Sequence, residues 1–263
     1  KQGELMIREK NIISGGMYEA EFYPIFPNGR RIPTSGRKAK SRPSSKEQAN
    51  LNDKNARKKI VRLVNANFGK GDIVVHGTYR DDEMPSSEAE CRRHIQNYIR
   101  RIKRYRKKEG LPEMKYIYVI EAKVSKKTGL IRYHFHLITN AMDRDTAEAM
   151  WPYGDWTNAD RLQPNEKGCE ALAKYLVKNP EGGKRWAQSK NLKKPKTPKP
   201  KDGRISRRFL SKLATERIDD AKYWENRYKG YRFIEAHAAF NEYNGHWYLS
   251  VIMFKKDTEV IRR

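Results

Sequence analysis

Residues 115–138, KYIYVIEAKVSKKTGLIRYHFHLI, decide the fold of this chain. Two runs rich in β-branched and aromatic residues, 115–124 and 130–138, flank a short turn that ends in glycine, and this pattern predicts a β-hairpin. The second run places His134 and His136 two residues apart. On a strand, that spacing directs both imidazoles to one face of the sheet. Because paired histidines also occur on ordinary sheet faces, a third ligand is needed before they indicate a metal site.

The pairing of the two strands supplies that third ligand. If Ser125 pairs with Leu130 across the turn, Glu121 stands directly opposite His134, with Cβ atoms roughly 5 Å apart. A slip of one residue would send Glu121 to the other face. A carboxylate and two imidazoles with open coordination positions suit Mn²⁺ or Mg²⁺ when phosphate oxygens complete the shell. We therefore predict a site for Mn²⁺ or Mg²⁺ at Glu121, His134 and His136.

The segments on either side of the hairpin complete a β-α-β-β-α-β order. In chain order the sequence predicts a strand (72–80), a helix that starts in PSSEAE (85–90), the two hairpin strands, a short helix (143–150), a strand (155–163) and a further helix (165–178). This is the split βαβ, or ferredoxin-like, order, an α+β fold with an antiparallel sheet and flanking helices. The histidine strand should lie between the 72–80 strand and the Glu121 strand. His76 is a spare metal candidate, although an ordinary strand histidine is the simpler interpretation.

The rest of the chain is expected to form accessory segments. We expect a basic N-terminal arm and helix (1–68), the core domain (69–182), a Pro/Lys linker (183–203) and a C-terminal helix and hairpin (204–263). In more detail, the sequence predicts a strand at 17–26, a helix from SSKE (44–47) to about Phe68, an unpacked KKPKTPKPK run (193–201), a helix at 206–228 and a hairpin at 231–254. Five aromatics of the C-terminal part could stack on bases or, more simply, pack in a small core: Trp224, Tyr228, Tyr231, Trp247 and Tyr248.

Composition indicates a polyanionic partner. The 263 residues carry a formal net charge of +25, with a pI of about 10.0 and a mean hydropathy of −0.99. Nucleic acid is the first expectation and an anionic membrane surface the second. No apolar run approaches the roughly 18 residues of a spanning helix, and no signal peptide is evident, so we expect no membrane partner. Cys91 and Cys169 lie far apart and predict reduced thiols in a cytoplasmic protein.

Cations on two helices are candidate nucleic-acid contacts. The helix that begins near residue 88 should bury one apolar stripe and expose a basic face. A solvated surface explains that face equally well, but the chain has too few acidic residues to balance it, which favours phosphate contact. The candidate set is Arg92, Arg93, Arg100, Lys103, Arg104 and, on the 165–178 helix, Lys174.

The 165–178 helix also carries a candidate nucleophile. Its apolar stripe leaves Tyr175 on the exposed side, with Lys178 three residues later. A surface tyrosine beside a lysine is unremarkable by itself. Beside a metal site, however, a phenol can attack a phosphodiester, and a lysine can compensate the charge that develops on the phosphate or help ionise the phenol.

Several segments together resemble the HUH endonucleases. HFHLI resembles their H-hydrophobic-H motif, and YLVK resembles the nucleophilic Y-x-x-K of the replication-initiator (Rep) branch. YVIEAKV resembles the strand that supplies the acidic ligand, and IVVHGTYR sits where those proteins have their first strand motif. The resemblance spans about residues 70–180 and agrees in order, spacing and topology. It is strongest to rolling-circle replication initiators of bacterial plasmids, phages and integrated elements.

This resemblance implies a mechanism and partners. It implies metal ligands Glu121, His134 and His136, nucleophile Tyr175 and supporting Lys178, with Ala171 in place of a second tyrosine. It further implies nicking and rejoining of single-stranded or hairpin origin DNA through a 5′-phosphotyrosyl intermediate and a free 3′-OH, in the bacterial cytoplasm. A host helicase is a candidate partner because the sequence contains no G-x-x-x-x-G-K-[ST].

Other functions remain open on sequence alone. An HUH transposase or a mobilisation relaxase would use the same chemistry, although relaxases place the tyrosine before the histidines and transposases are usually shorter. A non-catalytic single-stranded nucleic-acid-binding protein with a ferredoxin-like sheet is an alternative of another class.

Overall fold

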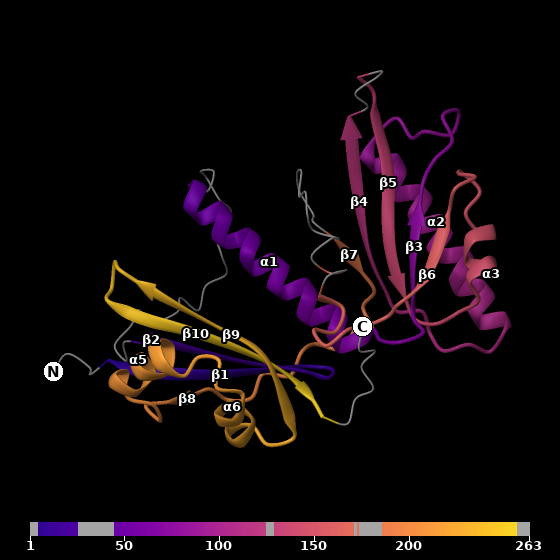
Figure 1. Ribbon diagram of the computed structural model, residues 1–263. Coiled ribbons are helices and arrows are strands. Elements are labelled where there is room, and N and C mark those ends of the chain that lie inside the picture. Colours follow the sequence, from indigo (N-terminus) through magenta and orange to yellow (C-terminus); the bar gives the residue numbers. More distant parts are fainter. Residues whose placement is uncertain (1–4, 26–44, 125–128, 171–172, 174–185, 257–263) are drawn as a thin grey trace, which may run out of the picture. The chain divides into compact units, whose positions relative to one another are not determined.

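The chain forms two compact units. The computed structural model describes residues 5–25, 45–124, 129–170, 173 and 186–256 (Figure 1). The first unit combines the N-terminal part of the chain up to Arg62 with the part from Lys194 onward, and the second holds most of Leu63–Lys193. None of the described helices is long and apolar enough to cross a membrane.

The second unit contains the predicted hairpin in a five-stranded antiparallel sheet. Its strands are β3 (Ile73–Gly77), β4 (Tyr116–Val124), β5 (Ile131–Thr139), β6 (Asn158–Arg161) and β7 (Ala187–Gln188). They lie in the order β6-β3-β5-β4-β7. The first four strands of that order reproduce the ferredoxin-like arrangement, and β5 lies between β3 and β4 as predicted. The α+β class and the antiparallel sheet are therefore confirmed.

Two helices, α2 (Glu88–Lys108) and α3 (Arg144–Ala149), accompany one face of this sheet (Figure 1). Ser87 caps α2, because its side chain accepts a hydrogen bond from the Glu90 N–H. The predicted apolar stripe of α2 is buried against alternate residues of β3, β4 and β5. From α2 these are Cys91, Ile95, Tyr98, Ile99 and Ile102, with Tyr105 partly buried.

Arg106 of α2 is an unexpected member of the interior. Its side chain is 2% exposed and donates to the carbonyl oxygens of Pro112 (2.8 Å), Asn140 (3.2 Å) and Ala141 (2.9 Å). Burial lowers the pKa of the Arg106 guanidinium from its ordinary value. These hydrogen bonds fix the end of α2 to the connection that follows it and to the end of β5.

The first unit joins the two ends of the chain in one sheet, which the sequence analysis did not foresee. Its strands are β1 (Met6–Ser14), β2 (Met17–Ile25), β8 (Lys201–Asp202), β9 (Tyr231–Asn241) and β10 (His246–Lys255). Their order is β8-β1-β2-β10-β9, so the predicted C-terminal hairpin pairs with β2. Gly245 has φ 66° in the β9–β10 turn, the left-handed conformation that favours glycine.

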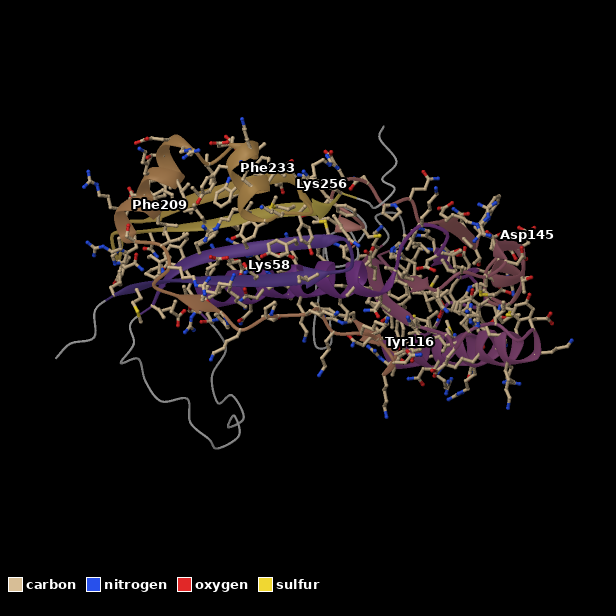
Figure 2. The ribbon with its side chains drawn as sticks, turned by 90° about the horizontal axis from the view of Figure 1, so that it is seen from below. Lys58, Tyr116, Asp145, Phe209, Phe233 and Lys256 are labelled. Carbon is tan, nitrogen blue, oxygen red and sulfur yellow. The ribbon has the colours of Figure 1, made fainter. Side chains whose placement is uncertain are left out.

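Helices cover both faces of this sheet (Figure 1). α5 (Arg207–Glu216) and α6 (Ala221–Arg227) bury Leu213 and Trp224 against one face. α1 (Lys46–Asn67) contacts the other face through Lys58, labelled in Figure 2, which binds Glu21 at 2.7 Å. Figure 2 also labels Phe233 and Lys256, whose backbone N–H and ammonium respectively bind the Glu225 carboxylate of α6.

Two expectations for the accessory segments were wrong. The 193–201 run is not an unpacked linker, because Lys196 exchanges two backbone hydrogen bonds with Ile13 (2.8 and 2.9 Å). The predicted 206–228 helix is two helices, since Asp220 caps a new one. The aromatics of the C-terminal part pack in the core, as the simpler interpretation held: Trp224 and Tyr228 are buried, and Tyr231 and Trp247 pack against the same cluster.

Candidate metal centre

The register of the β4–β5 hairpin is the predicted one. Glu121 pairs with His134, and Val119 pairs with His136. Strand alternation therefore places the carboxylate and both imidazoles on the face of the sheet that is opposite to α2. This face is apolar and buried toward Ile117 and Ile138 and becomes polar at the triad.

The three side chains converge. Glu121 Oε2 is 2.7 Å from His134 Nε2, and Glu121 Oε1 is 3.8 Å from His136 Nε2. One potential ligand atom from each residue lies within 4.8 Å of the other two, and this is the metal-competent group found among the described residues. One carboxylate with two imidazoles is a donor set that fits a divalent cation with open coordination positions.

The electrostatics of Glu121 favour the ionised, ligand-competent form. The hydrogen bond from His134 lowers the pKa of the Glu121 carboxyl far below its ordinary value, with a further contribution from His136, and burial opposes them only in part. In the metal-free protein His134 Nε2–H donates to the carboxylate. Metal binding through that nitrogen would release the proton, so metal affinity should depend on pH.

His76 of β3 lies behind the triad as a partner of His136. The two residues are directly paired across β3 and β5, and their Nδ1 atoms are 2.6 Å apart. Burial, followed by the proximity of His136, lowers the pKa of His76. Because one ring donates to the other through Nδ1, His136 directs Nε2 toward Glu121. His76 is not part of the metal-competent group, so the structure makes it a neighbour of a ligand.

Gly77 is required for the packing beside His76. It pairs with Phe135, and a Cβ built at Gly77 would come within 1.9 Å of the Phe135 ring. Phe135 is fully buried between His134 and His136 in sequence, on the opposite face. The absence of a side chain at Gly77 lets this ring lie against β3 and hold the strand on which both histidines stand.

The predicted nucleophile Tyr175 falls outside the described residues, as do Lys178 and Lys174. At the start of their segment, the Ala173 N–H donates to the Cys169 carbonyl oxygen at 3.0 Å, which is a helical hydrogen bond. Cys169 and Ala173 are both buried, as the apolar stripe predicts. Cys91 and Cys169 are free thiols, as expected.

The candidate cations of α2 lie on the other side of the sheet from the triad. Arg92 and Arg93 form ion pairs with acidic residues of the same helix. Lys103 lies over the ring of Tyr116, which is labelled in Figure 2, with Nζ 5.5 Å from the ring centroid. Arg100 and Arg104 are exposed. Any nucleic acid bound by this face would meet a surface separate from the metal centre.

Sequence reasoning missed two cations beside the triad, Lys123 and Arg132. They form the next same-face pair after Glu121–His134 in the hairpin register. The alternation that aligned Glu121 with His134 also puts them on the metal face, so the signal was present in the sequence.

Comparison with known proteins supports a role in replication. Residues 73–180, less than half of the chain, match the family model of the replication-associated protein ORF2. Neither the curated proteins nor the solved structures include a match to the chain. The matched segment starts with β3 and contains the whole Glu121–His134–His136 triad. This family similarity supports a replication initiator whose matched region carries a group able to hold a divalent metal.

Proposed function

We propose that this protein starts rolling-circle replication by nicking and rejoining single-stranded or hairpin-extruded origin DNA. The observation that carries the proposal is the convergence of Glu121, His134 and His136 within 4.8 Å, inside the segment that matches a replication-associated family. A host helicase is the proposed partner for unwinding.

Each residue of the proposed site has a role. Glu121, His134 and His136 hold Mn²⁺ or Mg²⁺, which when bound would polarise the scissile phosphate. Tyr175 is the nucleophile, and Lys178 compensates the negative charge that builds on the phosphate.

The chemistry is an exchange of one phosphodiester for another. The Tyr175 phenolic oxygen forms a bond to phosphorus as the bond from phosphorus to the 3′ oxygen breaks. The phenol proton is lost to solvent, and the departing 3′ oxygen takes up a proton to become the free 3′-OH. Since no high-energy bond is spent, a 3′-OH can attack the phosphotyrosine and reseal the strand.

A covalent-adduct assay tests this proposal. Labelled single-stranded oligonucleotides from candidate origins are incubated with the protein and Mn²⁺ and separated on a denaturing gel. We expect a slowly migrating protein–DNA band that requires metal. Tyr175→Phe should abolish it, and His134→Ala with His136→Ala should reduce it strongly.

Tyr243→Phe serves as the matched control, because Tyr243 is a fully exposed tyrosine in the β9–β10 turn of the other unit. It should leave the band unchanged. Adduct formation by Tyr175→Phe would refute the nucleophile assignment, and adduct formation by the double histidine variant would refute the metal assignment. A protein that binds the strand and never forms the band would instead be a non-catalytic binder.

A further inference from the structure

Two cations border the triad on the metal face of the second unit. Lys123 of β4 and Arg132 of β5 are directly opposite each other, one same-face pair closer to the hairpin turn than Glu121 and His134. Lys123 Nζ is 3.8 Å from Glu121 Oε2. Arg132 Nη1 is 2.5 Å from Asp81 Oδ1, in the connection that follows β3.

This pair lacks a stable charge balance. Like charges directly opposite on antiparallel strands repel each other. The carboxylate beside Lys123 is Glu121, which also accepts the His134 hydrogen bond. A divalent cation held by Glu121 would engage its oxygens and add two positive charges beside Lys123. The face would then be net positive even with Asp81 in place, which favours an anion between the two cations.

The geometry suits a phosphate of a nucleic-acid strand. Same-face pairs along an antiparallel strand are about 6.8 Å apart, similar to the separation of neighbouring phosphates on an extended single strand. Arg132 offers a planar fork of donors and Lys123 three rotatable donors. Their side chains are 49% and 63% exposed, so both can reach a bound strand. The α2 cations lie on the opposite face and cannot serve the same nucleotides.

We propose that Lys123 and Arg132 form a phosphate-binding subsite for single-stranded DNA beside the metal centre. The subsite holds the phosphate next to the scissile one, and the strand therefore crosses the triad toward the β4–β5 turn. That the neighbouring phosphate is the scissile one rests on the proposed function, whereas the binding of a phosphate by the pair does not.

Salt-dependent binding tests the subsite without the metal. A fluorescent oligo(dT) of about 20 nucleotides is titrated with the full chain in EDTA at several salt concentrations. For single strands, each phosphate contact contributes about 0.7 to the slope of log K against log salt. Lys123→Met and Arg132→Met should each reduce the slope by about 0.7, and Arg132→Lys should preserve it. Asp81→Asn should tighten binding, because it removes the carboxylate that competes for Arg132.

Lys222→Met is the matched control, since Lys222 is an exposed lysine on α6 of the other unit. Its slope should equal that of the unmodified protein. Unchanged slopes for both Lys123→Met and Arg132→Met would overturn the subsite, even if the protein forms the covalent adduct with Mn²⁺. Reduced slopes in a protein that forms no adduct would uphold the subsite and refute the nicking function instead.

Discussion

Replacing His76 with phenylalanine should weaken metal binding although His76 is not a ligand. Phenylalanine keeps an aromatic ring at this position but removes the 2.6 Å hydrogen bond to His136 Nδ1. His136 is 4% exposed, so water cannot readily replace the lost partner. Loss of a buried hydrogen-bond partner costs about 1–3 kcal/mol. Loss of the partner that orients a metal-ligating histidine typically costs about 10–100-fold in metal affinity, or about 1.4–2.8 kcal/mol.

Isothermal titration of the protein with Mn²⁺ measures this loss. His76→Gln should recover part of the affinity, because its side-chain amide can accept the Nδ1–H of His136. In the metal-free protein, ¹⁵N NMR should show His136 protonated on Nδ1, and His76→Phe should disturb that preference. His94→Phe is the control, since His94 stacks on Tyr153 with centroids 4.0 Å apart, on the α2 side of the sheet. Wild-type affinity and an unchanged His136 tautomer in His76→Phe would refute the orienting role.

Three further outcomes concern stability and metal binding. Gly77→Ala should destabilise the protein by about 2 kcal/mol in urea unfolding, because the new Cβ would overlap the buried Phe135 ring, while Gly69→Ala, with open space around it, should change little. Glu9→Gln should cost about 3 kcal/mol, because the carboxylate is 3% exposed and binds Arg227 at 2.6 Å. The Arg227, Tyr228 and Asn11 contacts lower the pKa of Glu9, so its contribution is present above the unfolded pKa of about 4.3 and is lost as pH falls from there through the lower folded pKa; the stability gap between the two proteins should narrow in that range, and a gap that stays constant to about pH 3 would refute the assignment. Glu121→Gln should abolish measurable Mn²⁺ binding by calorimetry, and retention of wild-type affinity would exclude Glu121 as a ligand.

The sequence by itself determined the hairpin and the face that carries the triad. Strand alternation has a period of two, so once the turn sets the register, Glu121 must share a face with His134 and His136. The amphipathic stripe of α2 and the ferredoxin-like element order also follow from local patterns, since each depends on residues close together in the chain.

Tertiary structure alone decided the rest. The pairing of β2 with β10 joins residues more than 200 positions apart, and no local pattern specifies which strand edges will meet. The same holds for the contact of His76 with His136, because it depends on β3 pairing with β5 in one register. The burial of Arg106 depends on carbonyl groups that are brought together only when the helix packs on the sheet. Local propensity fixes the elements and their faces, but long-range pairing decides which side chains become neighbours.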